Sequence, residues 1–141
     1  MCAGITYAKS KGTISVVSAG NNNANASNYV PAACPDAVTV GAVDATLTKA
    51  SFSNYGPKVD VSAPGVNIYS STRGNNYSGW AGTSMASPHI AGLISAIKTY
   101  RPYFTGDDIK AILKNPAFME TITSTVPLGY FPNMTKIFKG L

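Results

Sequence analysis

The stretch that decides how this chain folds is Gly82-Thr-Ser-Met-Ala-Ser-Pro-His-Ile-Ala-Gly92. Small residues crowd its first half and an apolar sequence of helical period follows, which predicts a helix from about residue 84 to residue 100. Pro88 falls in the first turns, where a missing N–H costs least, and Pro102 ends the pattern. The buried face is predicted from apolar residues spaced three and four apart: Ile90, Leu93, Ile94 and Ile97.

Ser84 stands at the start of this predicted helix, where free backbone N–H groups and the helix dipole favour negative charge. Two interpretations compete, an ordinary capping serine and a nucleophile that attacks a carbonyl group. Gly82 and Ala86 keep the approach to the hydroxyl clear, which favours the nucleophile. The run is not the G-x-S-x-G turn of the α/β-hydrolases, because Ala86 stands at the second glycine position.

The first part of the chain predicts a parallel sheet. Residues 3–11 are typical of the end of a helix, with Gly12 as its stop. Residues 13–18 and 37–43 are apolar and β-branched, as in buried strands, and the polar stretch 20–28 is a predicted loop. A helix, a strand, a loop and a second strand together indicate βαβ wiring and an α/β fold.

The later part of the chain adds shorter predicted elements to the same unit. Residues 59–62 predict a short strand stopped by Pro64, residues 66–70 allow another, and residues 73–80 predict a turn or hairpin. Thr105 is the predicted cap of a helix with acidic residues in its first turn. The end of the chain predicts a short amphipathic helix.

Composition excludes several classes of protein. The net charge is +5, but lysines and arginines are spread from Lys9 to Lys139 without a cluster, which argues against nucleic-acid binding. No window approaches 18 apolar residues, so no membrane-spanning helix is expected. The first residues lack the basic and apolar regions of a signal peptide.

The sequence predicts no metal site. Cys2 and Cys34 form no C-x-x-C pair, so a zinc site is unsupported. We expect two buried free thiols, with a single disulfide as the alternative. The acidic residues are scattered, and among them Asp60 is the candidate for a buried, hydrogen-bonded carboxylate.

A second polar group belongs to the run Ser18-Ala-Gly-Asn21, at the end of the first predicted strand. Ligands gather at the carboxyl ends of strands in an open parallel sheet. An asparagine there can aim its amide N–H₂ at a carbonyl oxygen that becomes negative during attack. A turn asparagine in an Asn-rich loop is the alternative, and the presence of Ser84 favours the first interpretation.

Residues 82–92 closely resemble the nucleophile segment of the subtilisin-like serine peptidases, the subtilases. The segments 40–44, 50–56 and 59–65 are similar to further segments of that family, and so is 129–133, where Phe131 replaces a usual glycine. The resemblance implies that residues 1–141 form the C-terminal half of a three-layer α/β peptidase domain. It implies Ser84 as nucleophile and Asn21 as oxyanion donor. Ser18, Ala19, Gly20 and Thr83 are expected to bind the polypeptide substrate.

The family's catalytic aspartate and histidine lie in Asp-Thr/Ser-Gly and His-Gly-Thr-His runs, and neither run occurs here. His89, five residues after Ser84, points about 140° away on a helix, so it is a poor base. The resemblance implies a packed, hydrogen-bonded, structural histidine instead. We therefore expect no useful peptidase activity from the chain alone. The missing aspartate and histidine are expected in an upstream half-domain, encoded by a longer gene, by a second chain or before a wrongly assigned start codon.

The resemblance also bears on cofactors and location. It implies that catalysis requires no cofactor. It also allows a structural calcium ion, without identifying the loops that would bind the ion, and it implies that the parent protein is secreted. The alternative function is a non-catalytic module, derived from a peptidase, that binds peptides or a protein partner. An esterase of another fold is disfavoured, because the serine motif departs from the α/β-hydrolase pattern.

Overall fold

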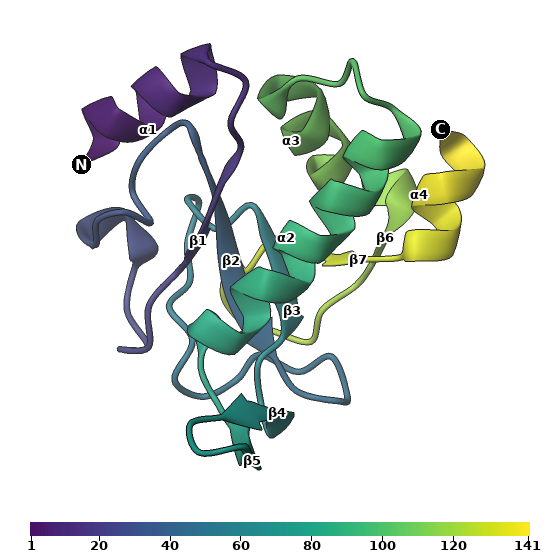
Figure 1. The fold of residues 1–141 in the computed structure, drawn as a ribbon. Helices are drawn as coiled ribbons and strands as arrows, with labels where there is room; N and C mark the ends of the chain where they lie inside the picture. Colours follow the sequence, from purple (N-terminus) through teal and green to yellow (C-terminus); the bar gives the residue numbers. More distant parts are fainter.

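The computed structural model describes residues 1–141, and Figure 1 shows a central sheet with helices packed around it. The elements in chain order are α1 (Cys2–Ser10), β1 (Ser15–Ser18), the 3₁₀ helix η1 (Ala26–Asn28), β2 (Ala37–Val43), β3 (Val61–Pro64), β4 (Ile68–Thr72), β5 (Asn76–Trp80), α2 (Thr83–Tyr100), α3 (Gly106–Lys114), the 3₁₀ helix η2 (Pro116–Phe118), β6 (Met119–Glu120), β7 (Phe131–Pro132) and α4 (Met134–Gly140).

The main sheet is parallel, as predicted, with strand order β1-β2-β3. Ser15 of β1 pairs with Ala37 of β2, and Val40 of β2 pairs with Val61 of β3. Every residue of the central strand β2 is buried. The prediction that the first strand is buried is wrong, because β1 lies at the edge of the sheet and all its residues are partly exposed.

The predicted βαβ wiring is also wrong in one respect, because neither crossover contains an α-helix. The chain passes from β1 to β2 through turns and the short helix η1, and from β2 to β3 through a loop. The connecting segments are rich in small and polar residues and lack an apolar stripe of helical period, so they have no face to pack as a helix.

The sheet is covered instead by α2, which begins at Thr83 and runs to Tyr100. Figure 1 shows α2 lying in front of β2 and β3, and α2 contacts all three strands of the sheet. The predicted inner face is confirmed, since Ile90, Leu93, Ile94 and Ile97 are all buried. No helix of the structure combines the length and apolar character that crossing a membrane requires.

Two smaller predictions are confirmed near α2. The segment before it forms the antiparallel hairpin β4–β5, which stands away from the main sheet in Figure 1 and exposes Tyr69, Tyr77 and Trp80. The segment after it starts α3 with a capping box, in which the Thr105 hydroxyl accepts the N–H of Asp108 and the Asp108 carboxylate accepts the N–H of Thr105.

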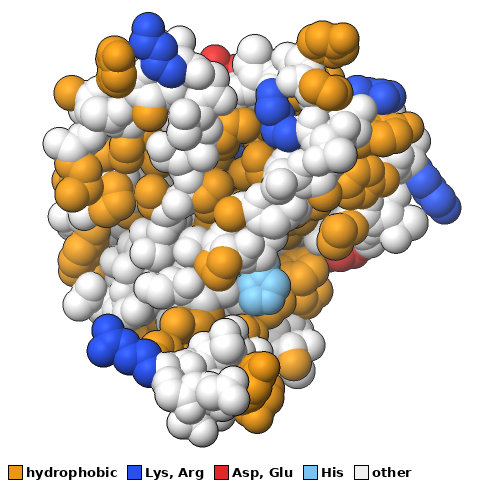
Figure 2. Space-filling model, in the orientation of Figure 1, with side chains coloured by type: hydrophobic (Ala, Val, Ile, Leu, Met, Phe, Trp, Pro, Cys, Tyr) orange, Lys and Arg blue, Asp and Glu red, His pale blue; other side chains and the backbone are white.

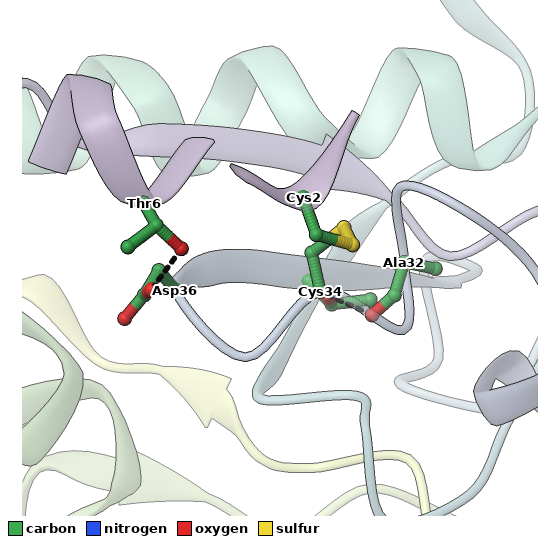
Figure 3. Close-up of a disulfide and its surroundings, with 6 residues drawn as sticks. Cys2, Thr6, Ala32, Cys34 and Asp36 are labelled. Carbon is green, nitrogen blue, oxygen red and sulfur yellow. Dashed lines mark hydrogen bonds between the residues drawn. A yellow bond between two sulfur atoms is a disulfide. The ribbon is translucent and has the colours of Figure 1, made fainter. Parts of the chain in front are cut away.

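Cys2 and Cys34 form a disulfide, drawn in Figure 3, so the expectation of two free thiols is wrong. Their Cα atoms are 5.2 Å apart, which suits a disulfide. The bridge fastens α1, which has no buried residue, to the segment before β2. Beside it the Thr6 hydroxyl donates to Asp36 at 2.6 Å, so α1 is held by a covalent and a polar contact.

Candidate active site

The residues predicted to form the site meet at one edge of the sheet. Asn21 follows the end of β1 by three residues, and the run from Gly82 begins α2. Gly82 N–H donates to the carbonyl of Gly65, which directly follows β3, at 2.8 Å. The start of α2 therefore lies at the carboxyl ends of the parallel strands, the place where such sheets bind ligands.

Thr83 fixes the side chain of Asn21 across 62 residues of sequence. The Thr83 backbone N–H donates to Asn21 Oδ1 at 2.9 Å, and the Thr83 hydroxyl donates to the same oxygen at 2.8 Å. A backbone N–H can only donate, so the oxygen of the Asn21 amide must face Thr83. The amide nitrogen of Asn21 consequently points away from Thr83.

The freed amide nitrogen faces a small space beside Gly82. A Cβ atom added to Gly82 would lie 3.5 Å from Asn21 Nδ2 and 3.7 Å from the backbone nitrogen of Ser84. The two predicted oxyanion donors therefore border one space, which the glycine leaves open. A negative oxygen in that space would have two N–H groups beside it, already oriented before it arrives.

Ser84 is not a capping residue. Gly82 is the N-cap and Thr83 the first helical residue, so Ser84 lies inside the first turn, where its backbone N–H has no partner within the helix. The side chain is exposed, and the polar contacts of this region are made by Thr83 and Asn21. The Ser84 hydroxyl is thus accessible beside the two donors.

The loop that carries Asn21 is held by Asn54, a residue that the sequence did not single out. Its side chain is fully buried and donates to the carbonyl of Ala19 at 2.9 Å. Its oxygen accepts the N–H groups of Asn22 at 2.9 Å and Ala24 at 3.0 Å. No local signal identifies this role, because the partners lie 30 or more residues away in the chain.

The predicted substrate-binding residues lie together around Asn21 but differ in exposure. Ser18 and Gly20 are partly exposed, whereas Ala19 and Thr83 are fully buried. The Thr83 hydroxyl accepts the N–H of Gly20 at 3.2 Å while it donates to Asn21, so this side chain is a positioning group. Substrate binding by these four residues stays a prediction.

A groove of about 470 Å³ runs from Ser84 between the hairpin and the first turns of α2. Apolar and hydroxyl-bearing side chains line it, and the size is typical of ligand sites. Its apolar walls are formed by Ile68, Trp80, Met85 and Pro88.

His89 also lines the groove, but its Nδ1 atom is 2.8 Å from the Met85 carbonyl of its own helix. The predicted hydrogen bond is therefore confirmed. The predicted packing is wrong: His89 is exposed, because it lies beside the stripe of α2 that faces the sheet.

Charged groups with altered pKa values lie outside the groove. Burial lowers the pKa of Lys49, whose ammonium donates to Asn23 Oδ1 at 2.8 Å, two residues after Asn21. Hydrogen bonds from Thr46 and Thr48 lower the pKa of Asp44. No cluster of three or more histidine, cysteine or acidic side chains forms a metal-binding group.

Comparisons with known proteins agree with this fold. Residues 1–135 match the family model described as the subtilase family. Subtilisin-like protease 2 of Pseudogymnoascus destructans is 55% identical over 86 residues, which are 60% of this chain and 22% of that protein. Subtilisin BL of Lederbergia lenta is 41% identical over 113 residues, which are 80% of this chain and 42% of that protein.

Solved structures give the same result. The crystal structure of a cold adapted subtilisin-like serine proteinase matches with a TM-score of 0.85 and 32% identity, over 92% of this chain and 48% of that one. A protease of Pseudoalteromonas arctica matches with a TM-score of 0.88 and 32% identity, over 99% of this chain and 46% of that one. The chain thus spans less than half the length of these relatives. On the match over residues 1–135, the chain belongs to the subtilase family.

Proposed function

We propose that this chain supplies the nucleophile and the oxyanion donors of a serine endopeptidase. One observation carries the proposal: Asn21 Nδ2 and the Ser84 backbone N–H border the same space, next to an exposed and accessible Ser84 hydroxyl. Acyl transfer by a serine enzyme depends on both a nucleophile and donors that stabilise the negative oxygen, and here the two lie side by side.

In the proposed reaction, Ser84 Oγ attacks the carbonyl carbon of a peptide bond and its proton passes to a general base. The carbonyl oxygen becomes negative and accepts hydrogen bonds from Ser84 N–H and Asn21 Nδ2. Collapse of this intermediate expels the amine, which takes up the proton, and leaves an acyl group on Ser84. Water then releases the acid and restores the hydroxyl.

The general base is proposed to come from outside these residues. The single histidine of the chain, His89, is bound through Nδ1 to the carbonyl of Met85 and lies about 1.4 turns along α2 from Ser84. We propose a partner half-domain of the same family, carrying the aspartate and the histidine. The exposed edge strand β1 and the apolar side chains on the flank beside α1 and η1, visible in Figure 2, offer it a surface.

The proposed substrate is a polypeptide that passes Ser84, with one part in the groove and another beside the segment that contains the partly exposed Ser18 and Gly20 and the buried Ala19. The parent protein is proposed to be secreted, because the Cys2–Cys34 disulfide is typical of oxidising compartments outside the cytosol. No cofactor is proposed for the chemistry.

The test is hydrolysis of a chromogenic peptide ester by the purified chain, alone and co-expressed with a subtilase segment that carries the aspartate and histidine runs. We expect Ser84-dependent turnover only from the combination. Ser84→Ala should abolish it, whereas Ser95→Ala, at an exposed serine farther along α2, should leave it intact. Asn21→Ala should lower kcat by about 10²–10³-fold, the magnitude known from subtilisin itself.

Ser84-dependent turnover by the chain alone would refute the proposal that the general base comes from outside these residues. A folded combination that binds peptides but never hydrolyses them would support the non-catalytic module instead. Reaction of the combination with a fluorophosphonate probe, compared with Ser84→Ala, reports activation of the serine separately from peptide binding.

A further inference from the structure

Lys110 of α3 lies at the edge of the sheet opposite Ser84, and oxygen atoms surround its ammonium group. Lys110 Nζ donates to the carbonyls of Pro35 at 2.9 Å and Ala37 at 2.6 Å, and it lies 3.3 Å from Asp60 Oδ2. Ala37 begins β2 and Asp60 directly precedes β3, so the oxygen atoms come from the starts of neighbouring strands. We call these three oxygens the oxygen cage.

The oxygen cage is held in place by groups other than Lys110. Asp60 is 5% exposed, which confirms the predicted buried carboxylate, and its Oδ2 accepts the N–H of Thr39 at 2.9 Å. Its Oδ1 lies 2.7 Å from Lys114 Nζ. The two carbonyls belong to the backbone around the start of β2. The acceptors would therefore keep their positions if the Lys110 side chain were removed.

The three oxygen atoms of the cage are of the kinds that bind a hard cation. Two backbone carbonyls and one carboxylate are the kinds of oxygen ligand that bind Ca²⁺ in proteins. An ammonium group has three N–H donors and a compact charge, so it satisfies three such acceptors in place of a metal ion. A divalent cation could not enter while the ammonium remains, because two cations would then repel each other in one small cage.

The structural calcium ion that the family resemblance leaves open therefore does not fit this cage as the chain stands. We propose that Lys110 is the resident cation of the oxygen cage, and that removing its ammonium group converts the cage into a site for Ca²⁺. The contacts of Lys98 differ from those of Lys110. The Lys98 ammonium donates to the carbonyls of Pro102 and Phe104, in the loop directly after its own helix, and these contacts include no carboxylate.

The test is the thermal unfolding of the 141-residue chain and its Lys110→Ala variant in EDTA and in Ca²⁺. With three protein ligands and water completing the shell, affinity should match weak extracellular calcium sites, so roughly 10 mM Ca²⁺ suffices. We expect the Tm of Lys110→Ala to rise by about 5 °C or more in Ca²⁺, and that of the unmodified chain to stay within about 1 °C. Isothermal titration with CaCl₂ should show one site in the variant alone.

Three controls isolate the cage. Lys114→Ala removes the other lysine from Asp60 but leaves Lys110 in place, so it should gain no response to Ca²⁺. Lys110→Ala with Asp60→Asn should lose the response, because the carboxylate charge is gone. KCl at equal ionic strength should not reproduce it. The proposal is overturned if the Tm of Lys110→Ala does not respond to Ca²⁺, or if that variant is unfolded and Ca²⁺ does not restore its folding. An equal response in the unmodified chain, in Lys114→Ala or in KCl also overturns it.

Discussion

Asn54→Ala tests whether one buried side chain holds the loop that carries Asn21. The substitution removes three hydrogen bonds at once, to the carbonyl of Ala19 and from the N–H groups of Asn22 and Ala24. Asn54 is fully buried, so no water replaces it directly and three backbone groups lose their partners.

The expected loss follows from those contacts. Each hydrogen bond contributes a net 0.5–1.5 kcal/mol, so Asn54→Ala should lower the free energy of unfolding by about 3 kcal/mol. For a chain of this size that is a fall in Tm of roughly 10 °C. Asn54→Asp should cost no less, because its carboxylate could still accept both N–H groups but would bury a charge and place an oxygen against the Ala19 carbonyl.

The assay is urea unfolding of the whole chain followed by circular dichroism. Asn76→Ala is the matched control: its side chain is exposed and makes a single contact, 3.5 Å from the Arg73 carbonyl. That variant should stay within about 0.5 kcal/mol of the unmodified chain. A loss below about 1 kcal/mol for Asn54→Ala, or equal losses for the two variants, would refute the reasoning.

Three further predictions concern the whole chain. Reducing the disulfide between Cys2 and Cys34, 32 residues apart, should lower the free energy of unfolding by about 3–4 kcal/mol in urea; an unchanged midpoint would contradict this. Threonine hydroxyls lower the pKa of Asp36 and of Asp108, so the folded chain binds fewer protons than the unfolded chain below about pH 4. The Tm should therefore fall as the pH drops below about 4, and less steeply in Asp36→Asn. Gly20→Ala, at φ 102° and with the Asn54 amide nitrogen against the added Cβ, should cost about 1–3 kcal/mol of stability in thermal unfolding, and unchanged stability would contradict this.

Local periodicity was enough to predict the elements that bury one continuous face. The strand predicted at residues 37–43 is β2 with the same bounds, and the helix predicted from residue 84 begins one residue earlier. Both succeed because the apolar pattern within each segment matches its own geometry. The capping box of Thr105 and Asp108 is equally local, since both partners lie within one helical turn.

Contacts between distant segments were not predictable in this way. The exposure of β1 depends on its place at the edge of the sheet, and the disulfide depends on where α1 meets the segment before β2. The holding role of Asn54 depends on a loop 30 or more residues away. No pattern within a segment carries this information. The resemblance to subtilases supplied the pairing of Ser84 with Asn21, which periodicity alone would not.

Thr83 shows why the predicted site and the fold cannot be separated. Its hydroxyl lies between two partners, donating to Asn21 Oδ1 and accepting the N–H of Gly20, while its own N–H also binds Asn21. These contacts join the end of β1 to the start of α2, and the same contacts turn the Asn21 amide nitrogen toward the space beside Gly82. A residue without the hydroxyl would leave the N–H of Gly20 without its acceptor and Asn21 with one donor where it had two. The junction of strand and helix and the orientation of the predicted oxyanion donor, Asn21, therefore depend on one buried hydroxyl group.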